Sequence, residues 1–540
     1  KTNYSGRSRL LYAGSNGGFL EAFDTGEWIA DDPGPPFVPA HYDRGSGAEV
    51  FGFMPWEVRQ NIRKQVVDDP ISRSNYVDGD VNSADVWIDA NGDDIGTGGE
   101  WHTYLLGALR EGGHHYYALD VTNPPDSTHP TGRDVFGSPG TALDFPSYAW
   151  EFPSEGNTVD QAYMGETWSK PIITKVKLNV FGSMTGETVE RWVAIVSGGY
   201  DGTSDPNPLE VSGSASTYAG DSTKGRGIYI IDLKTGGILA EQKFDPAVLI
   251  PPTPAGPNHQ ANMLFSVVST TSVLDLNFDG VADVIYVGDM GGNIWKWSIH
   301  NAGDDNITEG LGNRDQPNWR FKKFFGAASA TIGGVTYFKN IMFPPAAAYN
   351  NGVLYIAFGS GERRNLTFGG DVDDTTENNR FFVMLDSDPY ESGAPTAAIT
   401  EADLTDFSGS AAPQTFTDKG FYFEVADGEK FVTNIEIFNG DVIAATFTPT
   451  EDVDPCATRG QGTLYVFDLQ NGGGHFDDGA GGAERGLALG PGLPTDPKVS
   501  IGPGGKDTKI IIEKSGSDIE IIDEDPPALG GATLFWREND

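Results

Sequence analysis

The segment VLDLNFDGVADVIYV, residues 273–287, places a regular set of oxygen-bearing side chains between two apolar runs. Within the nine residues 275–283, such side chains occupy the first, third and fifth positions. Glycine occupies the sixth position and aspartate the ninth. Calcium takes about six to eight oxygen ligands, and a tight loop can supply several from these positions together with the seventh backbone carbonyl. The predicted Ca²⁺ ligands are Asp275, Asn277, Asp279, Val281 through its carbonyl, and Asp283.

Both flanks of this loop are apolar and rich in β-branched residues, which predicts buried strands on either side. The glutamate that closes helix–loop–helix calcium sites at position 12 is absent, because Tyr286 stands there. The sequence therefore predicts a strand–loop–strand site. A solvated Asp/Asn/Gly turn is the alternative. Each close pair of its carboxylates would repel by about 3–4 kcal/mol at an effective dielectric constant of about 20, which favours a bound cation.

The overall composition excludes several classes of partner. The 540-residue chain carries 77 Asp and Glu against 36 Lys and Arg, a formal charge of −41. So acidic a surface repels nucleic acid and anionic lipid, and neither is expected as a direct partner. No apolar run reaches the roughly 18 residues of a membrane-spanning helix. The chain begins at Lys1 without a signal peptide, and we expect it to be part of a longer protein.

A weak repeat runs along the chain, in which an apolar strand, a Gly-rich turn and an aromatic-rich strand follow one another. Units of adjacent strands repeated radially build a β-propeller, and 71 glycines and 34 prolines suit an all-β protein with many turns. Six units are clear, and strands from both chain ends are expected to complete a seventh. The six units pair residues 10–14 with 17–26, 105–107 with 116–120, 192–196 with 228–236, 284–288 with 292–297, 353–358 with 381–386, and 442–446 with 463–468.

We predict a single β-propeller domain over residues 1–540, with long loop insertions. A Gly/Asp-rich loop and a hairpin are expected at about 470–536, and one helix at 55–66, where proline occupies the first turn. Loops carry function more often than the scaffold that positions them. The expected insertions lie at about 200–225, 300–320 and 367–420.

The residues after the calcium-type loop carry a family likeness. The loop leads into VIYVGDMGGNIWKW at 284–297, and this succession resembles the C-terminal domain of the PilY/PilC family, the tip-associated biogenesis and adhesion factors of type IV pili. The opening YAGSNGGFLEAF at 12–23 is similar to the family pattern YxGxNDGxLHAF, with Gly17 in place of aspartate and Glu21 in place of histidine. Further matching pieces follow in the same order at 77–79, 117–122, 167–171 and 455–462.

The resemblance implies a modified seven-bladed propeller of the quinoprotein type on a bacterial cell surface, at the pilus tip or associated with the outer membrane. It implies that the protein is exported and that calcium occupancy of the loop regulates pilus extension against retraction, and so twitching motility. The implied partners are the type IV pilus machinery with its minor pilins, and host or abiotic surfaces. An N-terminal, often adhesive region is expected outside this chain.

A second Asp-rich loop offers oxygens at the first, third, fifth and ninth positions and a glutamate at the twelfth. However, Asp94 replaces the glycine at the sixth position, so a solvated insertion turn remains open beside a second calcium site. The ligands of this possible second site are Asp89, Asn91, Asp93, Ile95 and Glu100.

The sequence gives enzyme chemistry little support. Quinone-dependent dehydrogenases resemble this fold and hold a quinone beside calcium, but the lone Cys456 rules out the vicinal disulfide that many of them carry. The neighbours His114 and His115 are expected to point to opposite faces of a strand, which makes them poor co-ligands for a metal. We therefore predict no catalytic residue, no organic cofactor and no enzyme. A quinone-dependent dehydrogenase-like propeller and a pure adhesin are the alternatives.

Overall fold

The computed structural model divides into two compact units, which are described separately. Unit 1 comprises Lys1–Asp201, Thr223–Lys243 and Ala302–Asn318, and unit 2 comprises Gly202–Ser222, Phe244–Asn301 and Trp319–Asp540. The structure describes most, but not all, of both units. With some single positions or pairs omitted, the described residues are 8–62, 75–88, 101–124, 145–179, 187–201, 223–244, 262–304, 318–363, 366, 378–449, 460–501, 508–524 and 534–535.

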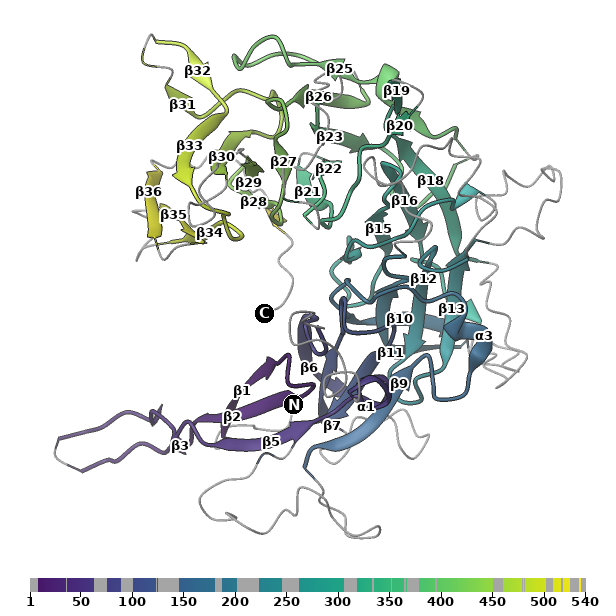
Figure 1. Ribbon diagram of the computed structural model, residues 1–540, viewed down its shortest axis with the longest axis vertical. Helices are drawn as coiled ribbons and strands as arrows, with labels where there is room; N and C mark the ends of the chain where they lie inside the picture. The colour runs from purple at the N-terminus through teal and green to yellow at the C-terminus, as the bar shows by residue number, and fades with distance from the viewer. Residues whose placement is uncertain are drawn as a thin grey trace. The chain divides into compact units, whose positions relative to one another are not determined.

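Unit 1 contains three sheets and a separate hairpin (Figure 1). The first sheet has the order β1 (Arg9–Gly14), β2 (Leu20–Gly26), β5 (Glu49–Phe53), and the hairpin pairs β3 (Trp28–Ile29) with β4 (His41–Tyr42). The second sheet consists of β6 (Val81–Trp87), β7 (Trp101–Gly107), β8 (Tyr116–Asp120) and β9 (Ser147–Phe152). The third has the order β13 (Ile238–Lys243), β12 (Gly227–Asp232), β11 (Thr188–Ser197), β10 (Ile172–Asn179), β17 (Gly303–Asp304).

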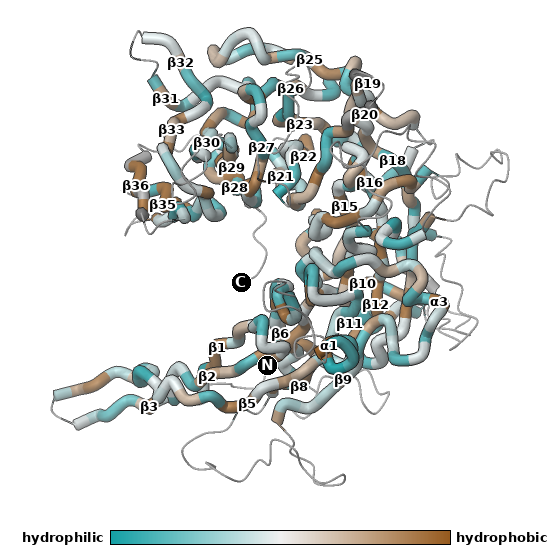
Figure 2. Tube along the Cα trace, in the orientation of Figure 1, coloured by the Kyte–Doolittle hydropathy of each residue, from teal (hydrophilic) through white to brown (hydrophobic). Residues whose placement is uncertain are grey.

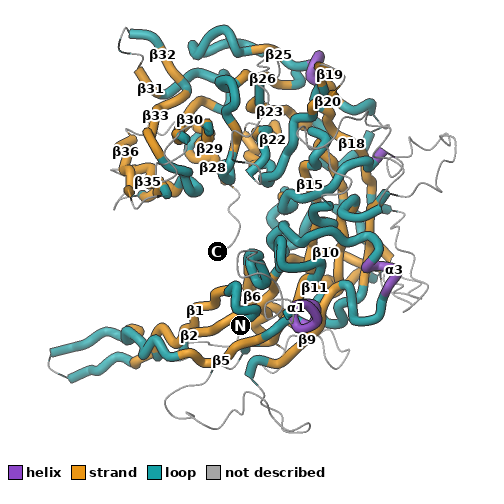
Figure 3. The backbone as a smooth tube through the Cα atoms, viewed as in Figure 1, coloured by secondary structure: helices purple, strands orange, loops and turns teal. Residues whose placement is uncertain are grey.

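Helices are short in the described part of unit 1 (Figure 3). Helix α1 spans Trp56–Asn61 with Pro55 at its N-cap, and α3 spans Thr158–Gln161, where the Asn157 side chain accepts a hydrogen bond from the Asp160 N–H. The helix expected at 55–66 therefore forms over its first half, and residues 63–66 lie outside the described residues.

Unit 2 contains four larger sheets and two small hairpins. The sheet that carries the calcium-type loop has the order β14 (Ser272–Leu274), β15 (Val284–Gly288), β16 (Asn293–Ser298), β18 (Arg320–Gly326), β24 (Ile399–Thr400). The next has the order β25 (Thr405–Asp406), β26 (Gly420–Glu424), β23 (Arg380–Asp386), β22 (Val353–Gly359), β21 (Ala346–Asn350), β37 (Leu534–Phe535). A third sheet joins β27 (Lys430–Phe431), β29 (Asp441–Thr448), β30 (Gln461–Asp468) and β33 (Gly486–Pro491), with β28 (Glu436–Phe438) also on β29. The last is β34 (Lys498–Ser500), β35 (Thr508–Lys514), β36 (Asp518–Glu524), and the hairpins are β19 (Ala330–Ile332) with β20 (Val335–Tyr337) and β31 (Phe476–Asp477) with β32 (Ala483–Glu484).

The sheets share one local design, in which strands that follow one another in the chain pair side by side and antiparallel. The runs β6–β9 and β10–β13 in unit 1, and β14, β15, β16 and β18 in unit 2, are all of this kind. Four-stranded antiparallel sheets are the units from which propellers are built. Seven sheets of three or more strands occur among the described residues, and the all-β, propeller-like fold class is confirmed.

One detail differs from expectation. The last described strand, β37, pairs with β21 and not with strands of the N-terminal end, and Ala348 lies opposite Phe535. The strand expected at 381–386, inside the stretch 367–420, is present as β23, which pairs with β22 on one side and β26 on the other. Of the other two expected insertions, residues 202–222 and 305–317 lie outside the described residues. The hairpin expected within 470–536 is present as β35 and β36.

The GDxxGNxW motif that follows the loop has a structural task. Asp289 is fully buried, and its carboxylate accepts hydrogen bonds from the N–H groups of Gly291 and Asn293, the Asn293 side chain and the Trp295 indole. Because a buried carboxylate is costly unless its oxygens are hydrogen-bonded, this arrangement fixes the turn between β15 and β16. Trp295 and Trp297 are likewise fully buried, so they serve as packing residues of the sheet.

Candidate metal centre

The calcium-type loop closes the hairpin between β14 and β15. Three residue pairs join these strands, ending with Leu274 opposite Val284, and the Asp283 N–H donates to the Leu274 carbonyl at 2.7 Å. The side chains of β15 are buried along its whole length, which holds this strand firmly in the core. The predicted strand–loop–strand arrangement is therefore confirmed, and the loop emerges from a rigid base.

The backbone turns sharply in the middle of the loop. Phe278 and Gly280 both have positive φ, at 62° and 84°. Glycine adopts this region freely, whereas a non-glycine residue there costs about 1–2 kcal/mol. Phe278 is 60% exposed, so it is not held in this conformation by burial. The conformation is instead held by side chain–backbone hydrogen bonds within the loop.

Three of the predicted ligands fold their oxygens back over the loop. Asp275 accepts hydrogen bonds from the N–H groups of Asp279 at 3.2 Å and Gly280 at 2.7 Å, one on each carboxylate oxygen. Asn277 Oδ1 accepts from the Asp279 N–H at 2.8 Å, and Asp279 Oδ1 accepts from the Val281 N–H at 2.9 Å. These side chains therefore lie on the inner side of one turn, as the alternating spacing predicts.

Asp283 differs from the other carboxylates of the loop in being buried, with only 3% of its surface exposed. Its Oδ2 accepts hydrogen bonds from the N–H groups of Leu276 at 2.7 Å and Asn277 at 3.3 Å. Burial raises the pKa of Asp283, these two hydrogen bonds oppose the rise, and the negative charges of Asp275 and Asp279 add to it. The side chain thus lies close to two other acids in a place where water cannot fully screen them.

The five predicted ligands share one loop, but their carboxylates do not form a compact cluster. Within the described ranges, no group of three or more His, Cys, Asp or Glu side chains is placed to hold a metal ion by itself. The donor set still fits calcium in its chemistry, because all of its atoms are oxygens, as a hard cation prefers, and the remaining donors are an amide and a backbone carbonyl. The possible second site at residues 89–100 lies outside the described residues, as does Cys456.

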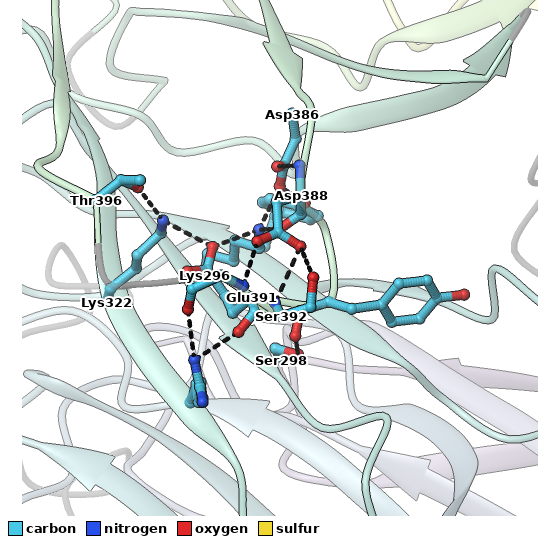
Figure 4. Close-up of polar contacts among 12 residues, drawn as sticks. Lys296, Ser298, Lys322, Asp386, Asp388, Glu391, Ser392 and Thr396 are labelled. Carbon is cyan, nitrogen blue, oxygen red and sulfur yellow. Dashed lines mark hydrogen bonds and ion pairs between the residues drawn. The ribbon is translucent and has the colours of Figure 1, made fainter.

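A buried ion-pair network lies on the neighbouring strand β16 (Figure 4). The Lys296 ammonium is fully buried and contacts Asp386 Oδ2 at 2.5 Å and Glu391 Oε1 at 2.7 Å. Lys322 on β18 contacts the same Glu391 oxygen at 2.7 Å. The Tyr286 hydroxyl donates to Asp386. We call these residues the Lys296 network: Lys296, Lys322, Asp386, Glu391 and Tyr286.

The segment that supplies Asp386 and Glu391 also contacts the end of β16 and the residues after it. Ser298 donates a hydrogen bond to the Tyr390 carbonyl at 3.1 Å, and the rings of Tyr390 and His300 lie 4.8 Å apart. Partial burial raises the pKa of Tyr390, and the negative charges of Asp283, Asp275 and Asp279 contribute to the rise. The segment from Asp386 to Gly393 therefore joins the end of β16 to the adjoining sheet that contains β23.

A second carboxylate-centred cluster in unit 1 was not expected from the sequence. His114 Nδ1 contacts Glu57 Oε1 at 2.8 Å, and His115 Nδ1 contacts Glu57 Oε2 at 2.6 Å. The expectation that the two histidines point apart is wrong, because they precede β8 and lie in irregular backbone. The separation of 57 residues between Glu57 and His114 leaves no local signal for this pairing. Burial would raise the pKa of Glu57, but hydrogen bonds from both histidines outweigh it and lower the pKa to about 2.

Comparison with known proteins supports the family likeness. No protein-family model matches the chain. It is 25% identical over 483 residues to a type IV pilus biogenesis factor PilY1 homolog of Xylella fastidiosa, covering 86% of this chain and 26% of that protein. It is also 25% identical over 296 residues to the type IV pilus biogenesis factor PilY1 of Pseudomonas aeruginosa, covering 54% of this chain and 17% of that protein.

A comparison with solved structures also finds a PilY1 domain. The crystal structure of the Pseudomonas aeruginosa PilY1 C-terminal domain matches with a TM-score of 0.56 at 19% sequence identity, covering 96% of this chain and 93% of that domain. The predicted resemblance to the C-terminal domain of PilY-type factors is therefore confirmed. The chain spans about a quarter or less of the length of these two full-length relatives. In the described residues, no helix has the length and apolarity to cross a membrane.

Proposed function

We propose that this relative of the PilY1 C-terminal domain is a calcium-binding regulatory and adhesive domain of a type IV pilus biogenesis factor, and that it acts without enzymatic turnover. The names of its relatives support the pilus role. The proposal places the domain on the bacterial cell surface, in contact with minor pilins and with host or abiotic surfaces. Calcium occupancy would shift the balance between pilus extension and retraction.

The observation that carries the calcium part of the proposal is the geometry of the loop at residues 275–283. Its side-chain oxygens line the inside of one turn, and Asp283 is buried beside two other acids. Neither Asp275 nor Asp283 forms an ion pair with Lys or Arg in the described ranges. A divalent cation would supply positive charge to the acids of this loop.

The chain's own residues have separate tasks in this proposal. Asp275, Asn277 and Asp279 would hold the ion with their side chains, and the buried Val281 and Asp283 with a backbone carbonyl and a carboxylate. Without the position-12 glutamate, the affinity should fall between the sensor and extracellular classes, from about micromolar to sub-millimolar. Binding would exchange hydrogen bonds within the turn for bonds to the ion, so we expect the loop to tighten around the ion.

Calorimetric titration with calcium tests the proposal directly. The unaltered chain should bind in the stated range, and Asp283→Asn and Asp275→Asn should each weaken binding by at least tenfold. Asparagine keeps an oxygen acceptor for the loop's N–H groups while it removes one charge. The matched control is Asp477→Asn, because exposed Asp477 accepts a backbone N–H in the same kind of turn.

Three outcomes would contradict the calcium site. These are no binding at several millimolar calcium, unchanged binding in both loop variants, or equal weakening by Asp477→Asn. A quinone-dependent dehydrogenase is the alternative from the sequence, and it would instead show cofactor-dependent reduction of a dye. Direct binding to surface glycans in the absence of calcium would favour a pure adhesin.

A further inference from the structure

The last three-stranded sheet of unit 2 has two faces of different character. On the inner face, Ile510 and Ile512 of β35 are almost completely buried and pack with Ile522 against Leu464 and Val466 of β30. This face fixes the hairpin to the neighbouring sheet. Because side chains alternate across a strand, every second residue of β36 must point the other way.

The outer face of the same hairpin is apolar and exposed. Ile519 and Ile521 are 63% and 58% exposed, and Ile521 lies directly opposite Ile511 of β35. Strands β35 and β36 are coloured brown over part of their length in Figure 2, the mark of apolar residues. Scattered exposed apolar residues are ordinary, but here they alternate on one of the two end strands of the sheet.

Strand β36 is an edge. The sheet has the order β34, β35, β36, and no other described strand pairs with β36. An edge strand of seven residues presents a row of backbone N–H and C=O groups that can pair with another extended segment. Proteins recognise extended peptides in this way, taking affinity from the backbone and specificity from alternate side chains.

The negative charge of β36 indicates which kind of extended segment could pair with it. The sequence of the strand is DIEIIDE, with four acidic residues and no basic one. Two copies of β36 paired edge to edge would bring these acids together, and the whole chain carries −41 charges. Like charges on paired strands are destabilising and opposite charges stabilise, so self-pairing is disfavoured and a basic strand is favoured.

We propose that β36 is a docking edge for an extended segment of a partner protein in which apolar and basic residues alternate. The partner would add a fourth strand to the sheet, cover Ile519 and Ile521 with its apolar side chains, and place Lys or Arg beside the acids of β36. The proposal is independent of calcium binding and of the pilus role, since it rests on a different part of the molecule.

Fluorescence polarisation with synthetic nine-residue peptides tests this edge. The probe is an alternating Lys/Val peptide. The two comparison peptides are an alternating Glu/Val peptide and a Lys/Val peptide N-methylated at every residue. The Lys/Val peptide should bind at least tenfold more tightly than both. N-methylation preserves charge and side chains but removes the backbone donors, so it separates strand addition from adsorption to an acidic surface.

A double variant locates the binding. Ile519→Lys with Ile521→Lys should weaken binding of the Lys/Val peptide at least tenfold, because it removes the apolar face and adds like charge. The matched control, Phe37→Lys with Val159→Lys, adds the same charge at equally exposed apolar positions of unit 1 and should change binding less than twofold.

The proposal is overturned if the Lys/Val peptide does not bind, if the N-methylated peptide binds equally well, or if both double variants behave alike. It is also overturned if sedimentation shows that the chain dimerises and that Ile519→Lys with Ile521→Lys abolishes the dimer, since a second copy would then be the occupant.

Discussion

The calcium-type loop and the Lys296 network both contain several acidic side chains, but the two regions stabilise the negative charge differently. In the network, two buried carboxylates receive a buried ammonium from within the chain, and Lys322 adds a second. In the loop, the oxygens of Asp275 and Asp283 accept only backbone N–H groups. The network carboxylates are therefore neutralised from within the chain, whereas Asp275 and Asp283 depend on backbone hydrogen bonds and, in our proposal, on a bound cation.

Removal of the internal cation should have the largest effect on this comparison. Lys296→Met leaves Asp386 buried without its cation, while Glu391 keeps Lys322, and loss of one partner of a buried pair costs about 3–5 kcal/mol. Urea unfolding of the variant should show a decrease of this size. Lys175→Met is the control, because Lys175 pairs with half-exposed Glu190 and such a pair contributes about 1 kcal/mol or less. Equal losses of unfolding free energy in the two variants would show that the buried Lys296 pair contributes no more than the surface pair of Lys175.

Glu57 offers a third solution, in which histidines stabilise the acid. The folded chain lowers the pKa of this carboxyl from its ordinary value of 4.5 to about 2. A lowered pKa means that the ionised form contributes stability above about pH 4.5, and that this contribution is lost as the pH falls toward 2. At about 1.4 kcal/mol per unit, the contribution is of order 3 kcal/mol.

Unfolding of Glu57→Gln checks this contribution. The variant should be less stable than the unaltered chain at pH 7, and the difference should shrink steadily between about pH 4.5 and pH 2. Glu190→Gln serves as the control, since its carboxylate is about half exposed. If the stability difference between the variant and the unaltered chain stays constant over this range of pH, the substitution acts through packing and not through loss of the ionised carboxylate.

Calcium should stabilise the loop by an amount that its concentration sets. At a hundred times the dissociation constant, a ligand that binds only the folded state adds about 2.7 kcal/mol to the free energy of unfolding. Thermal unfolding with and without calcium should show this gain in the unaltered chain and in Lys322→Met, but not in Asp275→Asn. An equal gain in Asp275→Asn would assign the stabilisation to another site.

The smallest effect concerns the hydroxyl that joins the two regions. Tyr286 lies on β15, directly after the loop, and donates to Asp386 of the network. Tyr286→Phe should reduce the free energy of unfolding by about 1–2 kcal/mol, because Asp386 loses one donor but keeps Lys296. Urea unfolding measures the loss, and a loss as large as that of Lys296→Met would mean that the hydroxyl and not the ammonium holds Asp386.

The sequence predicted the features that depend on neighbours in the chain. The buried strands on either side of the loop, the turn at Gly280 and the β35–β36 hairpin all follow from short patterns of apolar residues, oxygen-bearing side chains and glycine. Strand pairing between consecutive elements follows from the same signals, because such strands need only a short turn to meet.

The features that were missed depend on residues far apart in the chain. Lys296 meets Glu391 across 95 residues, and Glu57 meets His114 across 57. A lone lysine in an apolar strand gives no indication of which carboxylate will neutralise it. The alternation rule for His114 and His115 failed because it holds only inside a regular strand, and β8 begins one residue later.

The hairpin that carries the calcium-type loop also has a direction of mechanical weakness. If its two strands are pulled apart from their open end, the pairs break one after another, from Ser272–Tyr286 to Leu274–Val284, and the loop bears load last. An ion bound in the loop would then leave the force of the first rupture unchanged and raise only the force of the final rupture. Single-molecule pulling with handles at residues 272 and 286, in calcium and in chelator, would resolve the two events.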